Sequence, residues 1–129
     1  MHIHHIGYLV KNIDKAQEKF ETLGFQIEKP TVYDATRDIY IEFLSKDGYI
    51  IELVSSATKE SPVYDLYKRI RNSPYHICYL ADSFENNLEQ LASEGFTQIG
   101  EAAPSPALDG KKVVFLYSAA IGMIEILEE

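Results

Sequence analysis

The chain has 129 residues, a formal net charge of −8 and 46% hydrophobic residues, a composition typical of one globular domain. No apolar run reaches the roughly 20 residues of a membrane-spanning helix, and the acidic balance argues against binding to nucleic acid. The only cysteine, Cys78, cannot form an intramolecular disulfide, and no secretion signal is recognisable, so we expect a cytoplasmic protein.

The first half of the sequence alternates β-branched or aromatic runs with one helical pattern. Asn12 is a suitable N-cap, Gly24 a suitable helix stop, and residues 46–48 a hairpin turn. In chain order, this half predicts a strand at 3–10, a helix at 13–23, and strands near 25–29, 38–44 and 49–55.

The second half predicts the same succession after a joining helix. Pro62 suits the first turn of that helix, Ser83 is a suitable N-cap for the next one, and Gly95 a suitable stop. The elements are the joining helix at 61–71, a strand at 75–81, a helix at 84–94, and strands near 96–100, 112–117 and 122–127, with a loop at 102–110.

An internal repeat explains this succession. The segment 5–10 matches 76–81 at a shift of 71 residues, and 51–53 matches 124–126 at a shift of 73. Part of the insertion falls in a turn, because Phe43 precedes Glu52 by nine positions whereas Phe115 precedes Glu125 by ten. The pattern is βαβββ twice. We expect a single domain over 1–129, with one module at about 1–58, the joining helix, and a second module at about 73–129.

Two histidines and two glutamates recur with the repeat: His5 and Glu52 in the first half, His76 and Glu125 in the second. A lone glutamate in a strand usually lies on a solvated face of the sheet. A carboxylate that recurs mid-strand among apolar residues needs another explanation, because unpartnered buried carboxylates are rare. Pseudo-symmetric packing would bring all four side chains together, and two imidazoles with two carboxylates suit a divalent transition metal. His2 and His4 have no counterparts in the second half, and we expect both at the surface.

The whole chain resembles the vicinal oxygen chelate superfamily, which includes glyoxalase I, methylmalonyl-CoA epimerase, extradiol dioxygenases and bleomycin-resistance proteins. The stretches that carry the resemblance are 5–10, 51–53, 75–77 and 124–126. The resemblance implies an α+β fold in which two tandem βαβββ modules form a cupped eight-stranded mixed sheet with the helices outside. It also implies a divalent metal ion (Ni, Co, Zn, Fe or Mn). The ligands that it implies are His5, Glu52, His76 and Glu125.

Among these members, the epimerases are the most similar around 61–66 and 109–116. The segment 118–122 departs from the Asp-Pro-Asp-Gly turn that is usual in glyoxalase I. The epimerases also carry a glutamate before the third strand, for which Asp34 or Asp38 would have to substitute. The resemblance therefore implies a lyase or isomerase that removes a proton next to a carbonyl through a metal-stabilised enediolate. Glu125 would be the base, and Glu52 the second choice.

Two other functions stay open: a non-catalytic small-molecule binding or resistance protein, and an extradiol-type dioxygenase. The expected partner is a small molecule, a coenzyme A or glutathione thioester being one option, and we also expect a homodimer. An anionic thioester would need local cations, for which Lys68, Arg69, Arg71, Lys111 and Lys112 are candidates. The ordinary interpretation of these cations is solvated surface charge.

Overall fold

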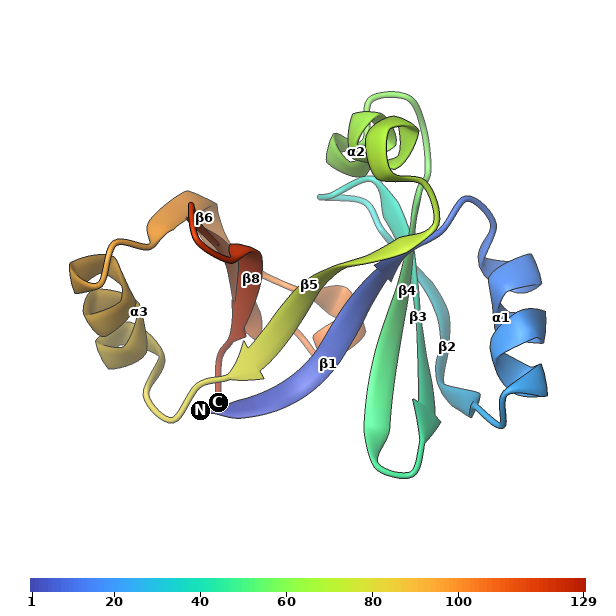
Figure 1. Cartoon of the computed structure of the whole chain (residues 1–129), viewed down its shortest axis with the longest axis horizontal. Coiled ribbons are helices and arrows are strands. Elements are labelled where there is room, and N and C mark those ends of the chain that lie inside the picture. Colours follow the sequence, from blue (N-terminus) through green and yellow to red (C-terminus); the bar gives the residue numbers. More distant parts are fainter. The chain divides into compact units, whose positions relative to one another are not determined.

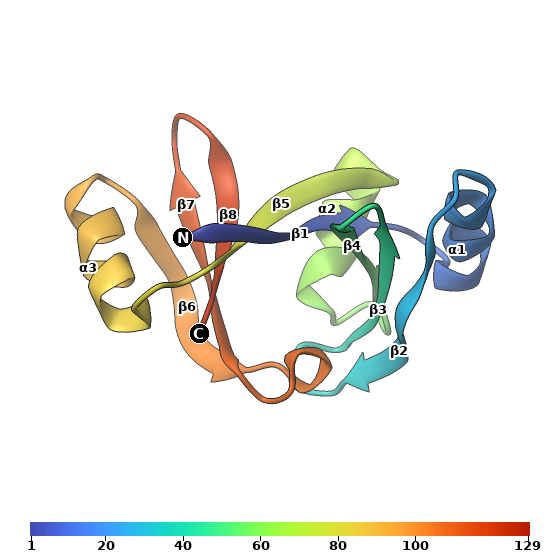
Figure 2. The same cartoon turned by 90° about the horizontal axis from the view of Figure 1, so that it is seen from below.

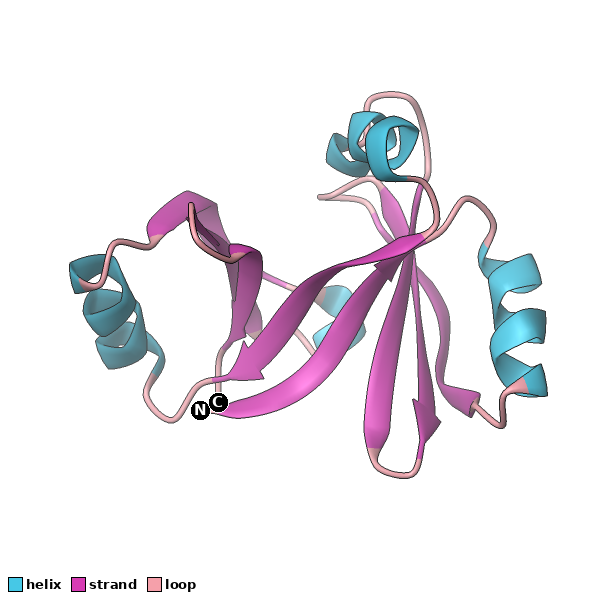
Figure 3. Ribbon diagram, in the orientation of Figure 1, coloured by secondary structure: helices cyan, strands magenta, loops and turns pink.

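The computed structural model describes all residues from 1 to 129, as eight strands, three α-helices and one short 3₁₀ helix. The chain folds into two compact units, one of His5–Tyr75 and one of His76–Glu129 together with Met1–His4. Each βαβββ succession can be followed along the chain in Figure 1, and Figure 3 separates its helices from its strands. The predicted α+β fold of two βαβββ modules is confirmed. The single domain over 1–129 stays a prediction.

The first module contains one helix and four strands in a mixed sheet. The strands lie in the order β2-β3-β4-β1, with β1 parallel to β4 and the other neighbours antiparallel. Its elements are β1 (His2–Leu9), α1 (Ile13–Thr22), β2 (Gln26–Asp34), β3 (Ile39–Lys46) and β4 (Tyr49–Ser56). Val10, Ile13, Leu44 and Leu53 form the core between α1 and one face of this sheet, which leaves the other face for the histidine–glutamate pair.

The predicted ends of these elements have the expected local chemistry. The Asn12 side chain accepts a hydrogen bond from the Lys15 N–H at 2.9 Å, and Gly24 follows the helix at φ +98°. The β3–β4 hairpin closes through Asp47 and Gly48, both at positive φ, as a two-residue turn of this hand requires.

The second module repeats this plan. Its strands lie in the order β5-β8-β7-β6, with β5 parallel to β8. Its elements are β5 (Ser73–Leu80), α3 (Phe84–Ser93), β6 (Thr97–Pro104), β7 (Lys112–Ser118) and β8 (Gly122–Leu127). Figure 2 shows α3 flanking this sheet, where Phe84, Val114, Leu116 and Ile126 are buried in one cluster. Met1–His4 belong to this unit, and the Met1 ammonium lies 2.7 Å from the Asp82 carboxylate.

Strand pairing confirms the repeat and locates one of its two inserted residues. Ile6 pairs with Ile51 and Gly7 with Glu52, as Ile77 pairs with Ile124 and Cys78 with Glu125. The β7–β8 hairpin closes through three residues, 119–121, where β3–β4 uses two. The extra residue between Phe115 and Glu125 therefore lies in the turn, as the sequence predicts.

Ser83 is the N-cap residue of α3, as expected, but another side chain makes the capping hydrogen bond. The Ser83 side chain itself makes none. The Glu129 carboxylate instead accepts from the Phe84 N–H at 3.0 Å, and the Asn87 side chain accepts from the Ser83 N–H at 3.1 Å. A carboxylate at a helix N-terminus replaces the hydroxyl because the helix dipole favours negative charge there.

The joining helix is confirmed as α2 (Pro62–Ile70), with Ser61 as its N-cap. None of the helices is long and apolar enough to cross a membrane. The expected loop at 102–110 is partly wrong, because β6 continues to Pro104 and a 3₁₀ turn, η1 (Pro106–Leu108), follows. Pro104 weakened the strand pattern, but β6 is an edge strand, where a missing N–H is tolerated.

Candidate functional site

The first module holds His5 and Glu52 together on the face of its sheet opposite α1. Glu52 lies opposite Gly7 in the β1–β4 ladder, and His5 shares the face of Gly7 because it lies two residues earlier in the strand. The Nε2 atom of His5 is 3.5 Å from Oε1 of Glu52, and the two residues are only 1% and 5% exposed. The structure therefore brings His5 and Glu52 together on one face of this sheet.

The second module holds an equivalent pair. Glu125 lies opposite Cys78 in the β5–β8 ladder, and His76 shares the face of Cys78. The Nε2 atom of His76 is 3.3 Å from Oε1 of Glu125, with the residues 4% and 5% exposed. Both modules thus use the same atoms at similar separations, on the same two strands of the repeat.

A phenylalanine packs against each histidine, a feature that the sequence analysis did not assign to the site. The ring of Phe43 lies 5.3 Å from that of His5, and the ring of Phe115 lies 5.1 Å from that of His76, both in T-shaped contacts. Each phenylalanine is also the direct cross-strand neighbour of the glutamate. The signal was available, because the repeat pairs Phe43 with Phe115. These rings fix the orientation of the imidazoles.

The two aspartates considered as a second acid or base already have local partners. Asp34 is fully buried, and its carboxylate accepts hydrogen bonds from the Arg37 side chain at 2.8 Å and from the Arg37 N–H at 3.1 Å. Asp38 accepts from the Tyr33 hydroxyl at 3.1 Å and from Thr58 Oγ1. The hydrogen bond to Asp38 is the main cause that raises the pKa of Tyr33. Both aspartates therefore stabilise the β2–β3 connection.

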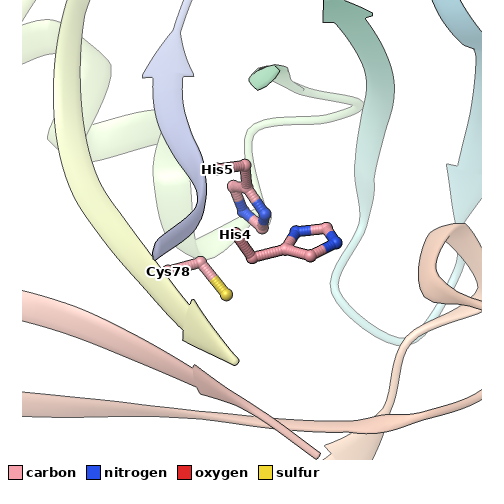
Figure 4. A group of neighbouring side chains, drawn as sticks. All are labelled: His4, His5 and Cys78. Carbon is pink, nitrogen blue, oxygen red and sulfur yellow. The ribbon is translucent and has the colours of Figure 1, made fainter. Parts of the chain in front are cut away.

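Cys78 and His4 lie close together in the second unit (Figure 4). Their potential ligand atoms are within 4.8 Å of one another, Cys78 is fully buried and His4 is half-buried. His4 is therefore less exposed than a typical surface residue, whereas His2 is exposed as expected. Alternation alone could not reveal the neighbour that covers His4.

Glu42 is a buried carboxylate on the opposite face from Glu52. It lies across from the core residue Leu53, is 3% exposed, and accepts one hydrogen bond from Thr31 Oγ1 at 3.1 Å. Its other oxygen, Oε1, has no hydrogen-bond partner. Burial raises the pKa of Glu42, which the hydrogen bond from Thr31 opposes and the charges of Asp14 and Glu21 reinforce.

The cations of the joining helix are exposed and rest on aromatic rings. The Lys68 ammonium lies 5.0 Å from the Tyr64 ring centroid and 3.6 Å from the Asp65 carboxylate, and the Arg71 guanidinium lies 5.9 Å from the Tyr67 ring centroid. These contacts agree with the ordinary interpretation of solvated side chains.

The chemistry of each pair suits a divalent transition metal. Two ligand atoms about 2.1 Å from one ion, at angles of 90–110°, lie roughly 3.0–3.4 Å apart. The nitrogen–oxygen separations of 3.5 and 3.3 Å are close to that range. Imidazole with carboxylate is a donor set that Mn, Fe, Co, Ni and Zn accept. Each pair could therefore fill two positions around an ion.

The fold and the site define the class of this protein: it has two βαβββ modules, each with a buried histidine–glutamate pair. Residues 4–115 match the Glyoxalase/Bleomycin resistance protein/Dioxygenase superfamily, and the chain belongs to it. The uncharacterized protein YqjC of Bacillus subtilis (strain 168) is 26% identical over 114 residues, which cover 87% of this chain and 79% of YqjC.

Solved structures share the fold over nearly the whole chain. The hypothetical protein BH1468 from Bacillus halodurans C-125 matches with a TM-score of 0.86 and 24% identity, over 98% of this chain and 93% of its own. Methylmalonyl-CoA epimerase from Mycobacterium tuberculosis matches with a TM-score of 0.85 and 18% identity, over 98% and 87%. The Streptomyces coelicolor epimerase in complex with 2-nitronate-propionyl-CoA matches with a TM-score of 0.84 and 17% identity, over 100% and 94%.

Proposed function

We propose that this protein is a divalent-metal-dependent enzyme that moves a proton on a carbon next to a carbonyl group. The observation that carries the proposal is the repetition of a buried pair, His5 with Glu52 and His76 with Glu125. A protein site for a transition metal usually supplies three or four ligands, and each pair supplies only two. We infer that the two pairs hold one ion together.

The four residues would divide the work by chemistry. When bound, the ion would act as a Lewis acid on the oxygen of the substrate carbonyl. His5 and His76 would bind through Nε2, the nitrogen that each turns toward its glutamate, with Phe43 and Phe115 holding the rings in place. Two carboxylates balance the charge of a divalent ion, so a neutral carbonyl compound could approach without repulsion.

Glu125 is the proposed base, and Glu52 mainly a ligand. The resemblance to the superfamily favours Glu125. Its 5% exposure supports the role, because little water can compete with the substrate for contact with a buried carboxylate. Glu125 would take the proton from the carbon next to the carbonyl at a carboxylate oxygen and return it to the product. Neither Asp34 nor Asp38 is proposed as a second base, since both carboxylates already accept hydrogen bonds.

The proposed substrates are thioesters or thiohemiacetals of small carbonyl compounds, of the methylmalonyl-CoA or lactoylglutathione type. The likeness in fold to structures of methylmalonyl-CoA epimerase supports the first type. The presence of both pairs favours an enzyme over a binding protein of the same superfamily. A fourth protein ligand also disfavours a dioxygenase, which needs open positions for oxygen.

The test is exchange with solvent. The protein is loaded with Ni, Co, Zn, Fe or Mn in turn and incubated in heavy water with methylmalonyl-CoA, while turnover of the methylglyoxal–glutathione adduct is assayed in parallel. We expect deuterium at the α-carbon or turnover with at least one metal. The absence of both reactions with every metal would overturn the proposed chemistry. Oxygen uptake with a catechol would point to the dioxygenase instead.

A pair of matched variants tests the base. Glu125→Gln should lower the rate at least about 100-fold, the usual contribution of a general base, with an unchanged circular dichroism spectrum. Glu89→Gln removes an exposed carboxylate on α3 and should leave the rate unchanged. Full activity of Glu125→Gln would contradict the assignment of the base.

A further inference from the structure

In the first module, one row of directly paired residues crosses all four strands at the level of the glutamate. Lys29 pairs with Phe43 in the β2–β3 ladder, Phe43 with Glu52 in the β3–β4 ladder, and Glu52 with Gly7 in the β4–β1 ladder. Directly paired residues point to the same face of a sheet. Lys29 therefore shares the face that carries the histidine–glutamate pair.

The corresponding row of the second module has the same centre and different ends. Ile99 pairs with Phe115, Phe115 with Glu125, and Glu125 with Cys78. The phenylalanine and the glutamate recur, whereas isoleucine replaces lysine at one end and cysteine replaces glycine at the other. Lys29 is thus the only residue in either row that is cationic at neutral pH.

A β-bulge places Lys29 in this row. The ladder is regular up to the pair of Ile27 with Leu44, so the next partner of Phe43 would be Glu28. The register shifts by one residue at this point, and Lys29 takes that place instead. Bulges re-aim side chains and are frequent beside active sites. The bulge therefore places the positively charged side chain of Lys29 opposite Phe43, in the row that contains Glu52.

One aromatic ring, that of Phe43, connects Lys29 with the histidine–glutamate pair. The Lys29 ammonium lies 6.0 Å from the Phe43 ring centroid, and the same ring contacts His5. Since β2 lies two strands from β4, the Lys29 and Glu52 backbones are roughly 10 Å apart.

We propose that Lys29 binds an oxyanion of the substrate, a carboxylate or a phosphate, a few bonds away from the reacting carbonyl. This inference rests on the proposed function, because it takes the histidine–glutamate pairs as the place where the carbonyl binds. It narrows the substrate to carbonyl compounds that carry a second, anionic end. The row of the second module, with Ile99 in the place of Lys29, offers no charge for that end.

Two acids that differ only at the far end test the inference. 2-Oxoglutarate and 2-oxopentanoate present the same chelating oxygens, but one ends in a carboxylate and the other in a methyl group. Isothermal titration of the Ni-loaded protein with each acid gives their affinities. We expect 2-oxoglutarate to bind about tenfold more tightly, the order of one charge-assisted hydrogen bond.

Three variants locate the effect. Lys29→Met should remove the preference by weakening only 2-oxoglutarate, and Lys29→Arg should keep most of it. Lys15→Met, an exposed lysine on α1, should keep all of it. An equal affinity of wild type for both acids, an unchanged preference in Lys29→Met, or an equal loss for both acids would overturn the inference. Elemental analysis of the same samples distinguishes failure of this inference from failure of the proposed function. Lys29 is not a proposed metal ligand, so every variant should bind as much metal as the wild type does.

Discussion

Glu42 allows a sharp prediction, because its buried carboxylate has no counterpart in the second module. Glu42 lies opposite Leu53 with Oε1 unbonded, whereas the matching residue Val114 lies opposite Ile126 inside the apolar core. Glu42→Met should therefore stabilise the protein at pH 7.5. The thioether fills about the same volume, and Thr31 is exposed, so its hydroxyl can bond to water instead.

The size of the effect follows from the unbonded oxygen. One buried polar atom without a partner costs about 1–3 kcal/mol, and since Thr31 still satisfies the other oxygen we expect a gain of about 1–2 kcal/mol. In a chain of this length that corresponds to about 4 °C in Tm for each kcal/mol.

The gain should depend on pH in a fixed direction. Burial raises the pKa of Glu42 above its ordinary value of 4.5, so the folded state binds a proton more tightly than the unfolded state does. The wild type is therefore least penalised below pH 4.5 and loses stability as the pH rises through the folded-state pKa. The advantage of Glu42→Met should grow over that range and then stay constant.

Urea unfolding followed by far-ultraviolet circular dichroism, at pH 4.5 and at pH 7.5, measures both effects. Glu42→Gln cannot titrate, so its stability relative to Glu42→Met should be the same at both pH values. Glu28→Met removes an exposed carboxylate from β2 and should change the free energy of unfolding by less than about 0.5 kcal/mol. A Glu42→Met variant less stable than wild type at pH 7.5, or an advantage that does not grow with pH, would refute the reasoning.

Three further predictions test other parts of the structure. Asn12→Ala should lower the free energy of unfolding by about 1 kcal/mol in urea titrations because it removes a capping bond, whereas Ser83→Ala should change it little, and equal losses would contradict the assigned caps. Phe43→Leu should weaken metal binding about three- to tenfold in competition with a chelator because the ring orients His5, and an unchanged affinity would contradict that role. Asp38→Asn should keep any proton-transfer activity within a few-fold of wild type in the exchange assay, and a loss as large as that of Glu125→Gln would make Asp38 a second base.

The elements of the modules were predictable because each one occurs twice, so that each half of the sequence supports the assignment of the other. The shift between 5–10 and 76–81 located the first strand of each module, and Gly24 and Gly95 located both helix ends. Errors fell on the edge strands. Pro30 and Pro104 weaken the strand pattern of β2 and β6, which nevertheless continue because an edge strand needs fewer N–H donors.

The histidine–glutamate pairs were predictable, but their surroundings were not. The recurrence of histidine and glutamate in the repeat singles out His5 and Glu52, whereas their proximity depends on the pairing of β1 with β4. The position of Lys29 depends on a bulge, and no residue pattern shows where a ladder gains a residue. The burial of Glu42 depends on the packing of α1 over β3, which no pattern in the sequence shows.

The most direct test of the central claim is the number of divalent ions bound by each chain. If the two pairs share an ion, elemental analysis of protein saturated with Ni or Zn and freed of excess metal should give one ion per chain, and His5→Ala and His76→Ala should each lower the affinity for that same ion. Two ions per chain would mean that each pair binds independently. No bound ion would contradict the metal site altogether.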